Sequence, residues 1–343
     1  MSLTKEYVAS LQSFETEEAY RASSSLNYSM LKNIPDGPEC LIKDVGTYAP
    51  NAFAIGNYVD RYFTDRESID ELYELAKPVI ELPESLETLY QIMQNNGKYE
   101  PSIEECISCC RENGLWSSIK DDDKLKSRFT DAFFDKLKQS ENKSDKIQLT
   151  VDQYSQALAS IDNIEKNEDA IKLITPTNDQ IVFPQFKYEF DMLVPSGKMY
   201  RFRIMIDLLI LNWVTQKISA VDIKTGANES HKFGDQFKKY RYDIQGILYY
   251  FGLLAFRKQY FPEWNKCTPE DFKFLYSPKK ANKKPIIVKL SEEFIRSNGD
   301  SFCGQDGIFK ILDDADWYLY GQTFDSHRLI DNSNGGVDII KLI

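Results

Sequence analysis

Three strand-like segments follow one another between residues 183 and 225, and they constrain the fold more than any other feature of the chain. Their sequences are FPQFKYEFDMLV, KMYRFRIMIDLLIL and QKISAVDIKT. Pro195-Ser196-Gly197 separates the first two segments, and residues 212 to 215 lie before the third. Because only short turns connect the segments, we predict that they pair as an antiparallel meander.

The segment that follows these strands changes to a helical spacing. Residues 233 to 261 carry aromatic or aliphatic side chains every three or four positions, which predicts one long helix. Two short strand-like segments, DFKFLYS and KPIIVKL, come next, and a last helix is expected near residues 305 to 321. This order of helices, three strands, a helix and further strands predicts an α/β fold.

The first part of the chain, to about residue 175, is predicted to be mainly helical. A helix is expected over residues 52 to 63, and Ser25 or Ser29 is expected to cap an earlier one. Further helices are expected at residues 68–77, 84–95, 103–113, 123–139 and 151–168, and KQSENKSDK is the expected flexible connection. We treat the chain as one domain, 1–343, with a helical front (1–175), an αβ core (180–290) and a C-terminal helix and tail (291–343).

The charge of the chain is strongly acidic. A formal net charge of -11 at pH 7 argues against a protein that coats nucleic acid with its whole surface. Basic residues still gather locally, because HKFGDQFKKYRY holds Lys238 and Arg241 and five lysines crowd residues 279 to 289. An acidic body with basic edges fits an enzyme that grips phosphates locally. Solvated lysines on loops explain the same pattern.

Hydropathy and cysteine content favour an intracellular protein. No apolar segment approaches the roughly 20 residues that cross a bilayer, and the N-terminus shows no signal-peptide pattern, so we expect no membrane contact. Six cysteines without a secretory signal favour free thiols. Cys106, Cys109 and Cys110 in CISCC have spacing that could begin a metal site. No second pair follows at ligand spacing, so we interpret them as helix-packing residues.

The segment AVDIKTG places an acid and a lysine two positions apart on a predicted strand. Side chains alternate between the faces of a strand at about 3.3 Å per residue, so Asp222 and Lys224 point the same way, about 6.5 Å apart. Upstream, Asp207 lies within the apolar run FRIMIDLLIL, where an unpaired carboxylate is costly. The hairpin link between the two strands can bring Asp207 beside Asp222.

Two carboxylates that converge beside a lysine suit a hard divalent cation. Mg²⁺ or Mn²⁺ takes oxygen ligands, which Asp207, Asp222 and the backbone carbonyl of Ile223 would supply. The ammonium of Lys224 would orient or help deprotonate a water and offset charge on a pentacovalent phosphate. A surface ion pair at a strand end is the alternative explanation of Asp222 and Lys224.

The long predicted helix carries a polar stripe. Tyr242, Gln245 and Tyr249 fall at i, i+3 and i+7, and they interrupt the apolar periodicity of a core-facing helix. Gln245 has apolar neighbours and therefore needs hydrogen-bond partners. A phosphate or a water near the metal would serve, and so would a backbone group.

The segments IDLL, VDIKTG and FKKYRYDIQGILYY together resemble the PD-(D/E)XK nuclease superfamily, and most of all its phage-type recombination exonucleases similar to RecE and lambda exonuclease. The resemblance implies a restriction-endonuclease-like core, with a mixed sheet flanked by helices and a helical N-terminal portion. It implies that Asp207 and Asp222 bind the metal and that Lys224 assists the water. Gln245 and Tyr249 match the glutamine and tyrosine that line the family's site.

The helical front extends the resemblance. LNYSMLKNIPDGP is similar to the motif that opens these domains, which places Ser29 and Lys32 near the scissile strand. AFAIGNYVDRYF resembles the helix that supplies an extra metal ligand, with Asp60 where His or Glu is more usual. Gly56, one turn earlier, would let this helix approach the sheet. A capping or surface acid is the alternative for Asp60.

Glu189 lies on the first strand, where the family often carries an acid. The resemblance implies a role for Glu189 behind the metal ligands or on a second metal. Asp191 shares its face of the strand, and a solvated edge strand explains both acids.

The function that the resemblance implies is a Mg²⁺- or Mn²⁺-dependent exonuclease that degrades linear duplex DNA in phage-type recombination or repair. It would work in the cytoplasm of a bacterium or a phage-infected host cell, as a ring of three or four copies, with a single-strand annealing partner. Lys238, Arg241 and Tyr242 are expected DNA contacts beside Ser29 and Lys32. A structure-specific endonuclease and a catalytically silent DNA-binding or scaffold protein would share the fold.

Overall fold

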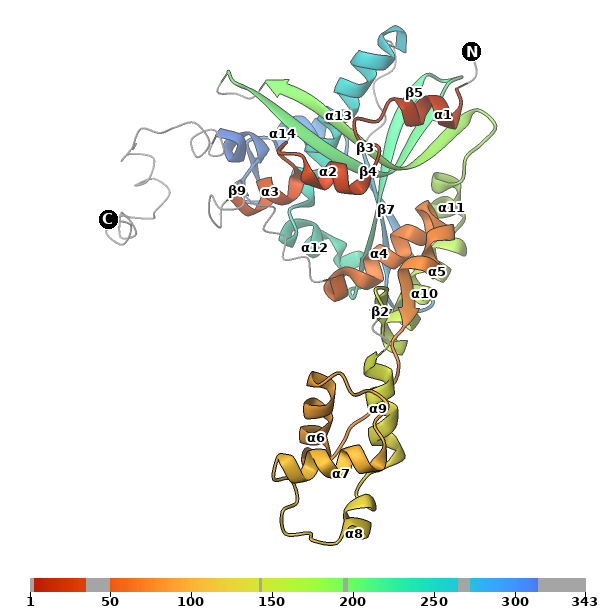
Figure 1. The fold of residues 1–343 in the computed structure, drawn as a ribbon. Coiled ribbons are helices and arrows are strands. Elements are labelled where there is room, and N and C mark those ends of the chain that lie inside the picture. The colour runs from red at the N-terminus through yellow and green to blue at the C-terminus, as the bar shows by residue number, and fades with distance from the viewer. Residues whose placement is uncertain (1–2, 35–49, 142–143, 194–196, 265–271, 314–343) are drawn as a thin grey trace, which may run out of the picture. The chain divides into compact units, whose positions relative to one another are not determined.

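The computed structural model describes residues 3–34, 50–141, 144–193, 197–264 and 272–313 (Figure 1). The chain forms two compact units. Unit 1 comprises Met1–Ala49, Ile55–Arg66 and Gln156–Ile343, and unit 2 comprises Pro50–Ala54 and Glu67–Ser155. This division reflects only which parts of the chain pack together. It does not test whether residues 1–343 form a single nuclease domain, which stays a prediction.

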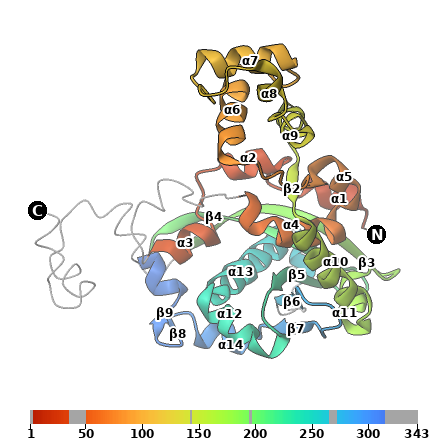
Figure 2. The ribbon, with the colours of Figure 1, turned by 90° about the horizontal axis from the view of Figure 1, so that it is seen from below.

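A five-stranded mixed sheet forms the centre of unit 1, in the order β3-β4-β5-β6-β7. Strands β3 and β4, β4 and β5, and β6 and β7 pair antiparallel, whereas β5 and β6 are parallel. The predicted antiparallel meander is therefore confirmed, and helices flank the sheet in a mixed α/β fold (Figures 1 and 2). The strands are β3 (Gln180–Leu193), β4 (Met199–Asn212), β5 (Lys217–Gly226), β6 (Lys273–Pro278) and β7 (Ile286–Lys289).

The predicted helix over residues 233 to 261 is two helices, α12 (Phe233–Lys239) and α13 (Tyr242–Tyr260). The break falls at Arg241, which has a left-handed backbone with a φ of 57°. Its guanidinium donates to both carboxylate oxygens of Asp243, at 3.1 and 2.9 Å, and to the carbonyl of Asp306 at 2.6 Å. Periodicity alone missed this break because the contact with Asp306 comes from a distant part of the chain.

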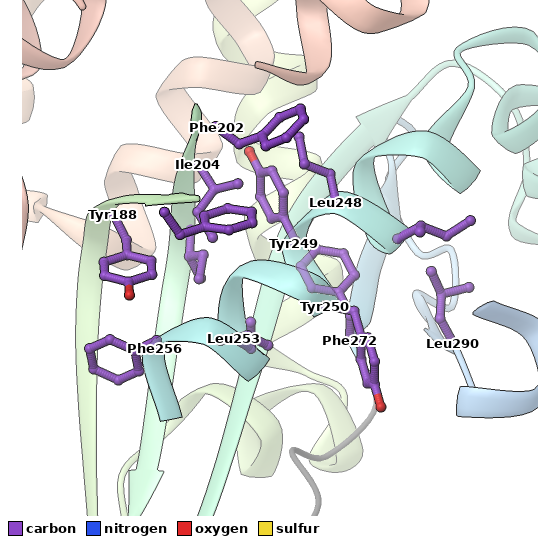
Figure 3. Packing of buried hydrophobic residues seen from close by; sticks show 14 of the residues in the cluster. Tyr188, Phe202, Ile204, Leu248, Tyr249, Tyr250, Leu253, Phe256, Phe272 and Leu290 are labelled. Carbon is purple, nitrogen blue, oxygen red and sulfur yellow. The ribbon is translucent and has the colours of Figure 1, made fainter. Parts of the chain in front are cut away.

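Helix α13 holds the core of unit 1 together. It packs against β3, β4 and β5, and Figure 3 shows its apolar side chains facing those of the sheet. Burial of this surface stabilises the fold at roughly 25 cal/mol per Å². The labelled residues of the core are Tyr188, Phe202, Ile204, Leu248, Tyr249, Tyr250, Leu253, Phe256, Phe272 and Leu290 (Figure 3).

The helices near the N-terminus of unit 1 begin at polar caps. Asn27, rather than Ser25 or Ser29, caps α3 (Tyr28–Asn33), because its side chain accepts a hydrogen bond from the Met30 N–H at 3.0 Å. Thr4 and Thr16 cap α1 (Lys5–Ser10) and α2 (Glu17–Ala22) in the same way. The helix expected over residues 52 to 63 is α4 (Pro50–Thr64), which begins in unit 2 and continues into unit 1.

Two further regions differ from the sequence expectation. The helix expected at 151–168 is α10 (Val151–Glu165) followed by α11 (Glu168–Ile174), because the Asn167 side chain caps a second helix. The helix expected near 305–321 is helical over 308–313, and residues from 314 onward lie outside the described part. The remaining elements here are α14 (Glu292–Ser297), β8 (Ser301–Phe302), β9 (Gln305–Asp306) and short 3₁₀ turns at Arg66–Ser68, Ser230–Lys232 and Pro262–Trp264.

Unit 2 is mainly helical. Helices α6 (Glu84–Asn95) and α7 (Ile103–Glu112) confirm two predictions. The helix expected at 123–139 is α8 (Asp122–Lys126) and α9 (Asp131–Glu141). The one expected at 68–77 is α5 (Ile69–Leu72) followed by β1 (Tyr73–Leu75), which pairs parallel with β2 (Ile147–Leu149). That strand depends on a partner about 70 residues away, so local spacing does not reveal it.

The cysteines of α7 belong to the core of unit 2. Cys106, Cys109 and Cys110 are free, buried thiols that pack against apolar side chains of α6, α8 and α9. Burial raises the pKa of Cys106 to about 12 and that of Cys110 to about 11. Thiols held in the neutral form are poor metal ligands, which agrees with their interpretation as packing residues.

Candidate active site

Asp207 and Asp222 lie opposite each other at the end of the β4–β5 ladder. The last paired residues are Leu208 and Val221, so the next step of the same register places the two acids side by side. Asp207 Oδ2 accepts a hydrogen bond from the backbone N–H of Ile223 at 2.8 Å. The carboxylate thus satisfies a backbone donor just beyond the last ladder pair.

Lys224 and Gln245 hold the two oxygens of Asp222. Lys224 Nζ lies 2.5 Å from Asp222 Oδ1, and Gln245 Nε2 donates to Asp222 Oδ2 at 2.5 Å. Asp222 and Gln245 are buried, which removes the surface ion pair as an explanation. Burial lowers the pKa of Lys224, but the charges of Asp222, Tyr242 and Asp207 and the hydrogen bond to Asp222 together outweigh burial and leave that pKa above its ordinary value. Lys224 is therefore a fixed ammonium.

A third carboxylate reaches this cluster from α4. The pKa of Asp60 is raised to about 7, first by burial and then by the charge of Asp222. The pKa of Asp207 is raised well above its usual range, first by burial and then by the charges of Asp60 and Asp222. Each acid therefore lies within electrostatic reach of the others, and Lys224 partly offsets their repulsion.

Gln185 positions Asp60 and was not expected from the sequence. Its Nε2 donates to Asp60 Oδ2 at 2.7 Å. Gln185 has a φ of 48°, a left-handed conformation within β3, and faces Asp207 between the ladder pairs Pro184–Leu208 and Phe186–Ile206. A positive φ in a long-chain residue is strained, and such strain gathers at functional sites. No pattern in the sequence marks it, because the conformation depends on tertiary packing.

The oxygen atoms of this cluster are of the type that binds a hard cation. Asp60 Oδ1 and Gln245 Oε1 are buried oxygens without a hydrogen-bond partner among the described residues, and Asp222 Oδ1 has only the ion pair with Lys224. Carboxylate oxygens are the ligands that Mg²⁺ and Mn²⁺ prefer. As they stand, no group of three or more His, Cys, Asp or Glu side chains in the described ranges converges on one metal position. Lys224 occupies the position nearest to Asp222 Oδ1.

Tyr242 and Tyr249 of α13 have different surroundings. The ring of Tyr242 lies 5.1 Å from Lys224 Nζ, so it covers the ammonium. Tyr249 is buried and packs edge-on against Phe272, with ring centroids 5.4 Å apart (Figure 3). Burial raises the pKa of Tyr249, and the charges of Asp222 and Asp207 raise it further. Tyr249 therefore borders the carboxylates from within the core.

The predicted DNA contacts differ in their exposure to solvent. Ser29 and Lys32 lie half-buried on α3, and the Lys32 ammonium stands 5.0 Å from the Tyr28 ring. Lys238 is exposed on α12. Arg241 is buried against Asp243, so its guanidinium does not face solvent as a phosphate contact would.

Two other sequence expectations meet different surroundings. Glu189 accepts a hydrogen bond from Ser25 Oγ at 2.5 Å and lies 3.6 Å from Arg201, on the wall of a separate cavity of about 580 Å³. A Cβ at Gly56 would lie 3.5 Å from Thr225 Oγ1, an ordinary contact, so close approach does not require that glycine. Gly226 is the constrained one, because a Cβ there would lie 2.5 Å from the Tyr276 hydroxyl.

No protein-family description and no curated protein matches this chain. Among solved structures, a protein from Eubacterium rectale described as a "Putative exonuclease" matches with 14% sequence identity and a TM-score of 0.43. The match covers 94% of this chain and 89% of that chain. A likeness at this level carries no argument about function, so the proposals below depend on the geometry of the site. Within the described ranges, no helix has the length and apolar character to span a membrane.

Proposed function

We propose that this protein is a metal-dependent nuclease of the PD-(D/E)XK type that hydrolyses phosphodiester bonds in DNA. One observation carries the proposal: Asp207 and Asp222 face each other on neighbouring strands, and Lys224 stands 2.5 Å from Asp222. Asp60 adds a third carboxylate within electrostatic range. Buried acids whose pKa values are raised by one another are costly to keep without a cation.

The residues of the cluster have separate roles in this proposal. Asp60, Asp207 and Asp222, with the Ile223 carbonyl, would hold Mg²⁺ or Mn²⁺, which would supply Lewis-acid polarisation of the phosphate. Lys224 stays protonated, so it orients the attacking water and stabilises the negative charge that grows on the phosphoryl oxygens. Gln245 fixes the carboxylate of Asp222 through its Nε2 donor. Tyr242 covers Lys224 and limits its access to bulk water.

We further propose an exonuclease that acts on linear duplex DNA. An endonuclease of the same fold would use the same carboxylates, and a silent DNA-binding protein would keep the fold without hydrolysis. The assay uses end-labelled linear duplex and closed circular duplex, each with Mg²⁺ or with EDTA. Loss of linear DNA alone supports the exonuclease, nicked circles support the endonuclease, and no metal-dependent loss contradicts the nuclease proposal.

Variants of the cluster connect this activity to the site. Asp222→Asn and Lys224→Ala are each expected to lower the hydrolysis rate at least roughly a hundredfold, the usual cost of removing one electrostatic group. Lys124→Ala is the matched control, because Asp122 and Lys124 repeat the same spacing on exposed α8. A cluster variant that cuts DNA as fast as Lys124→Ala would show that the assignment is wrong.

A further inference from the structure

Three tyrosines lie next to one another beside the candidate active site. Tyr28 of α3 donates its hydroxyl hydrogen bond to the carbonyl of Tyr240, between α12 and α13. The rings of Tyr240 and Tyr242 are 5.8 Å apart at an interplanar angle of 33°. We call Tyr28, Tyr240 and Tyr242 the tyrosine platform. None of the carboxylate roles above explains Tyr28 or Tyr240.

The turn that contains Tyr240 is held in place by the contacts of the next residue, Arg241. Arg241 adopts its left-handed conformation with a buried guanidinium bound to Asp243 and to the carbonyl of Asp306. A continuous helix would place residues 240 and 242 about 200° apart around its axis. The break instead brings the rings of Tyr240 and Tyr242 next to each other in a tilted arrangement and leaves Tyr240 43% exposed. An exposed aromatic ring is thus held by a buried ion pair.

The platform leads from solvent to the site. Tyr240 is exposed, Tyr242 is half-buried, and the Tyr242 ring lies 5.1 Å from Lys224 Nζ, which contacts Asp222. Burial raises the pKa of Tyr28, and the positive charge of Lys224 lowers that pKa by a smaller amount. A continuous series of contacts therefore connects the accessible ring of Tyr240, through Tyr242, to Lys224, the lysine that is proposed to act on the phosphate.

Basic side chains line the outer part of the platform. Lys239 Nζ lies 5.5 Å from the Tyr240 ring, and Lys32 Nζ lies 5.0 Å from the Tyr28 ring. Lys238 and Lys239 are exposed, and the structure shows neither in an ion pair with any described residue. Accessible aromatic rings with lysines beside them are what proteins use to hold single-stranded nucleic acid, since bases stack on the rings and phosphates meet the cations.

We infer that Tyr240 stacks on a base of an unpaired DNA strand and guides that strand to Lys224 and the carboxylates. This inference builds on the proposed nuclease function and names the form of DNA that enters the site. Bases within a duplex are already stacked on each other, so the ring accepts only a nucleotide released from its partner. Tyr28 is a positioning residue, because it holds the Tyr240 carbonyl in place.

The test measures binding without hydrolysis. A fluorescently labelled single-stranded DNA oligonucleotide is titrated with the full chain in EDTA. Tyr240→Ala is expected to weaken binding about tenfold, whereas Tyr240→Phe keeps the parent affinity because stacking needs no hydroxyl. Tyr7→Ala is the control, since Tyr7 is exposed to the same degree, 44% against 43%. Urea denaturation of each variant checks that the fold is intact.

An oligonucleotide series that moves one abasic position along the strand makes the test specific to stacking. At one position, removal of the base weakens binding by the parent about tenfold and leaves binding by Tyr240→Ala unchanged. Equal losses for parent and Tyr240→Ala at every position overturn the inference, as does parent-like binding by Tyr240→Ala. Either result leaves metal-dependent hydrolysis of linear duplex by the parent untouched, so the two proposals fail separately.

Discussion

At the scale of single residues, the site buries carboxylates whose hydrogen-bond and ion-pair partners offset only part of the free-energy cost of burial. Asp222 is buried and has two partners, Lys224 and Gln245. Asp60 has a donor on one oxygen only, from Gln185, and its other oxygen has no hydrogen-bond partner among the described residues. Three acids therefore share one ammonium, which leaves excess negative charge for a cation to neutralise.

This excess charge predicts a pH-dependent stability of the metal-free protein. The pKa of Asp60 is raised from 3.8 to about 7, and that of Asp207 is raised as well. At a pH between 3.8 and about 7, the folded state therefore binds more protons at these two residues than the unfolded state does. These two groups make the free energy of unfolding fall as pH rises from about 4 to 7, and we expect a net fall of at least about 1 kcal/mol. Urea denaturation in EDTA measures this fall.

The matching variant for that experiment is Asp60→Asn, which removes one titrating group and lessens the repulsion on Asp207. Its free energy of unfolding is expected to depend less on pH over the same range. An unchanged slope would mean that the acids do not interact as their burial and the direction of their pKa shifts indicate.

Gln185 carries a second residue-level prediction. Gln185→Ala removes the donor to Asp60 and keeps the strained backbone, whereas Gln185→Gly removes the donor and relieves the strain. The Gly variant should be more stable than the Ala variant by about 1 kcal/mol. Both should bind Mn²⁺ in calorimetry roughly tenfold more weakly than the parent, because a group that orients a ligand is lost. Parent-like Mn²⁺ affinity in both variants would exclude this role.

At the scale of elements, the break between α12 and α13 depends on contacts of Arg241 with Asp243 and with the distant carbonyl of Asp306. Arg241→Ala would leave Asp243 buried without its cation, which costs about 3–5 kcal/mol. The double variant Arg241→Ala with Asp243→Ala should recover part of that loss, because no uncompensated charge remains. Thermal or urea denaturation of the three proteins tests this. A single variant as stable as the parent would mean that the ion pair does not fix the turn.

The elements also show what local sequence can predict. The meander of β3, β4 and β5 follows from apolar alternation and short turns, and it brings Asp207 beside Asp222 as expected. The break at Arg241, the strand β1 and the conformation of Gln185 depend on partners distant in the chain. Local spacing cannot contain that information. The cap at Asn27 was missed for a simpler reason, since three neighbouring polar residues compete for one capping position.

At the scale of the whole molecule, an acidic chain is proposed to act on an acidic polymer. The net charge of -11 repels DNA at a distance, so binding must come from local basic groups such as those at the tyrosine platform. A ring of copies that concentrates these groups around a channel is a further proposal, which light scattering of the purified protein tests. A single-strand annealing partner belongs to the same proposal, and co-purification from the cell tests it.

The central claim is that the carboxylates on β4 and β5 act with Lys224 on a phosphodiester bond. The most direct measurement is the rate at which Asp207→Asn hydrolyses end-labelled linear duplex DNA in Mg²⁺. The amide of the variant keeps an oxygen for the Ile223 N–H, so the fold is preserved while one negative charge is removed. We predict a rate at least roughly a hundredfold below the parent. A parent-like rate, or a parent rate that EDTA leaves unchanged, would contradict the account.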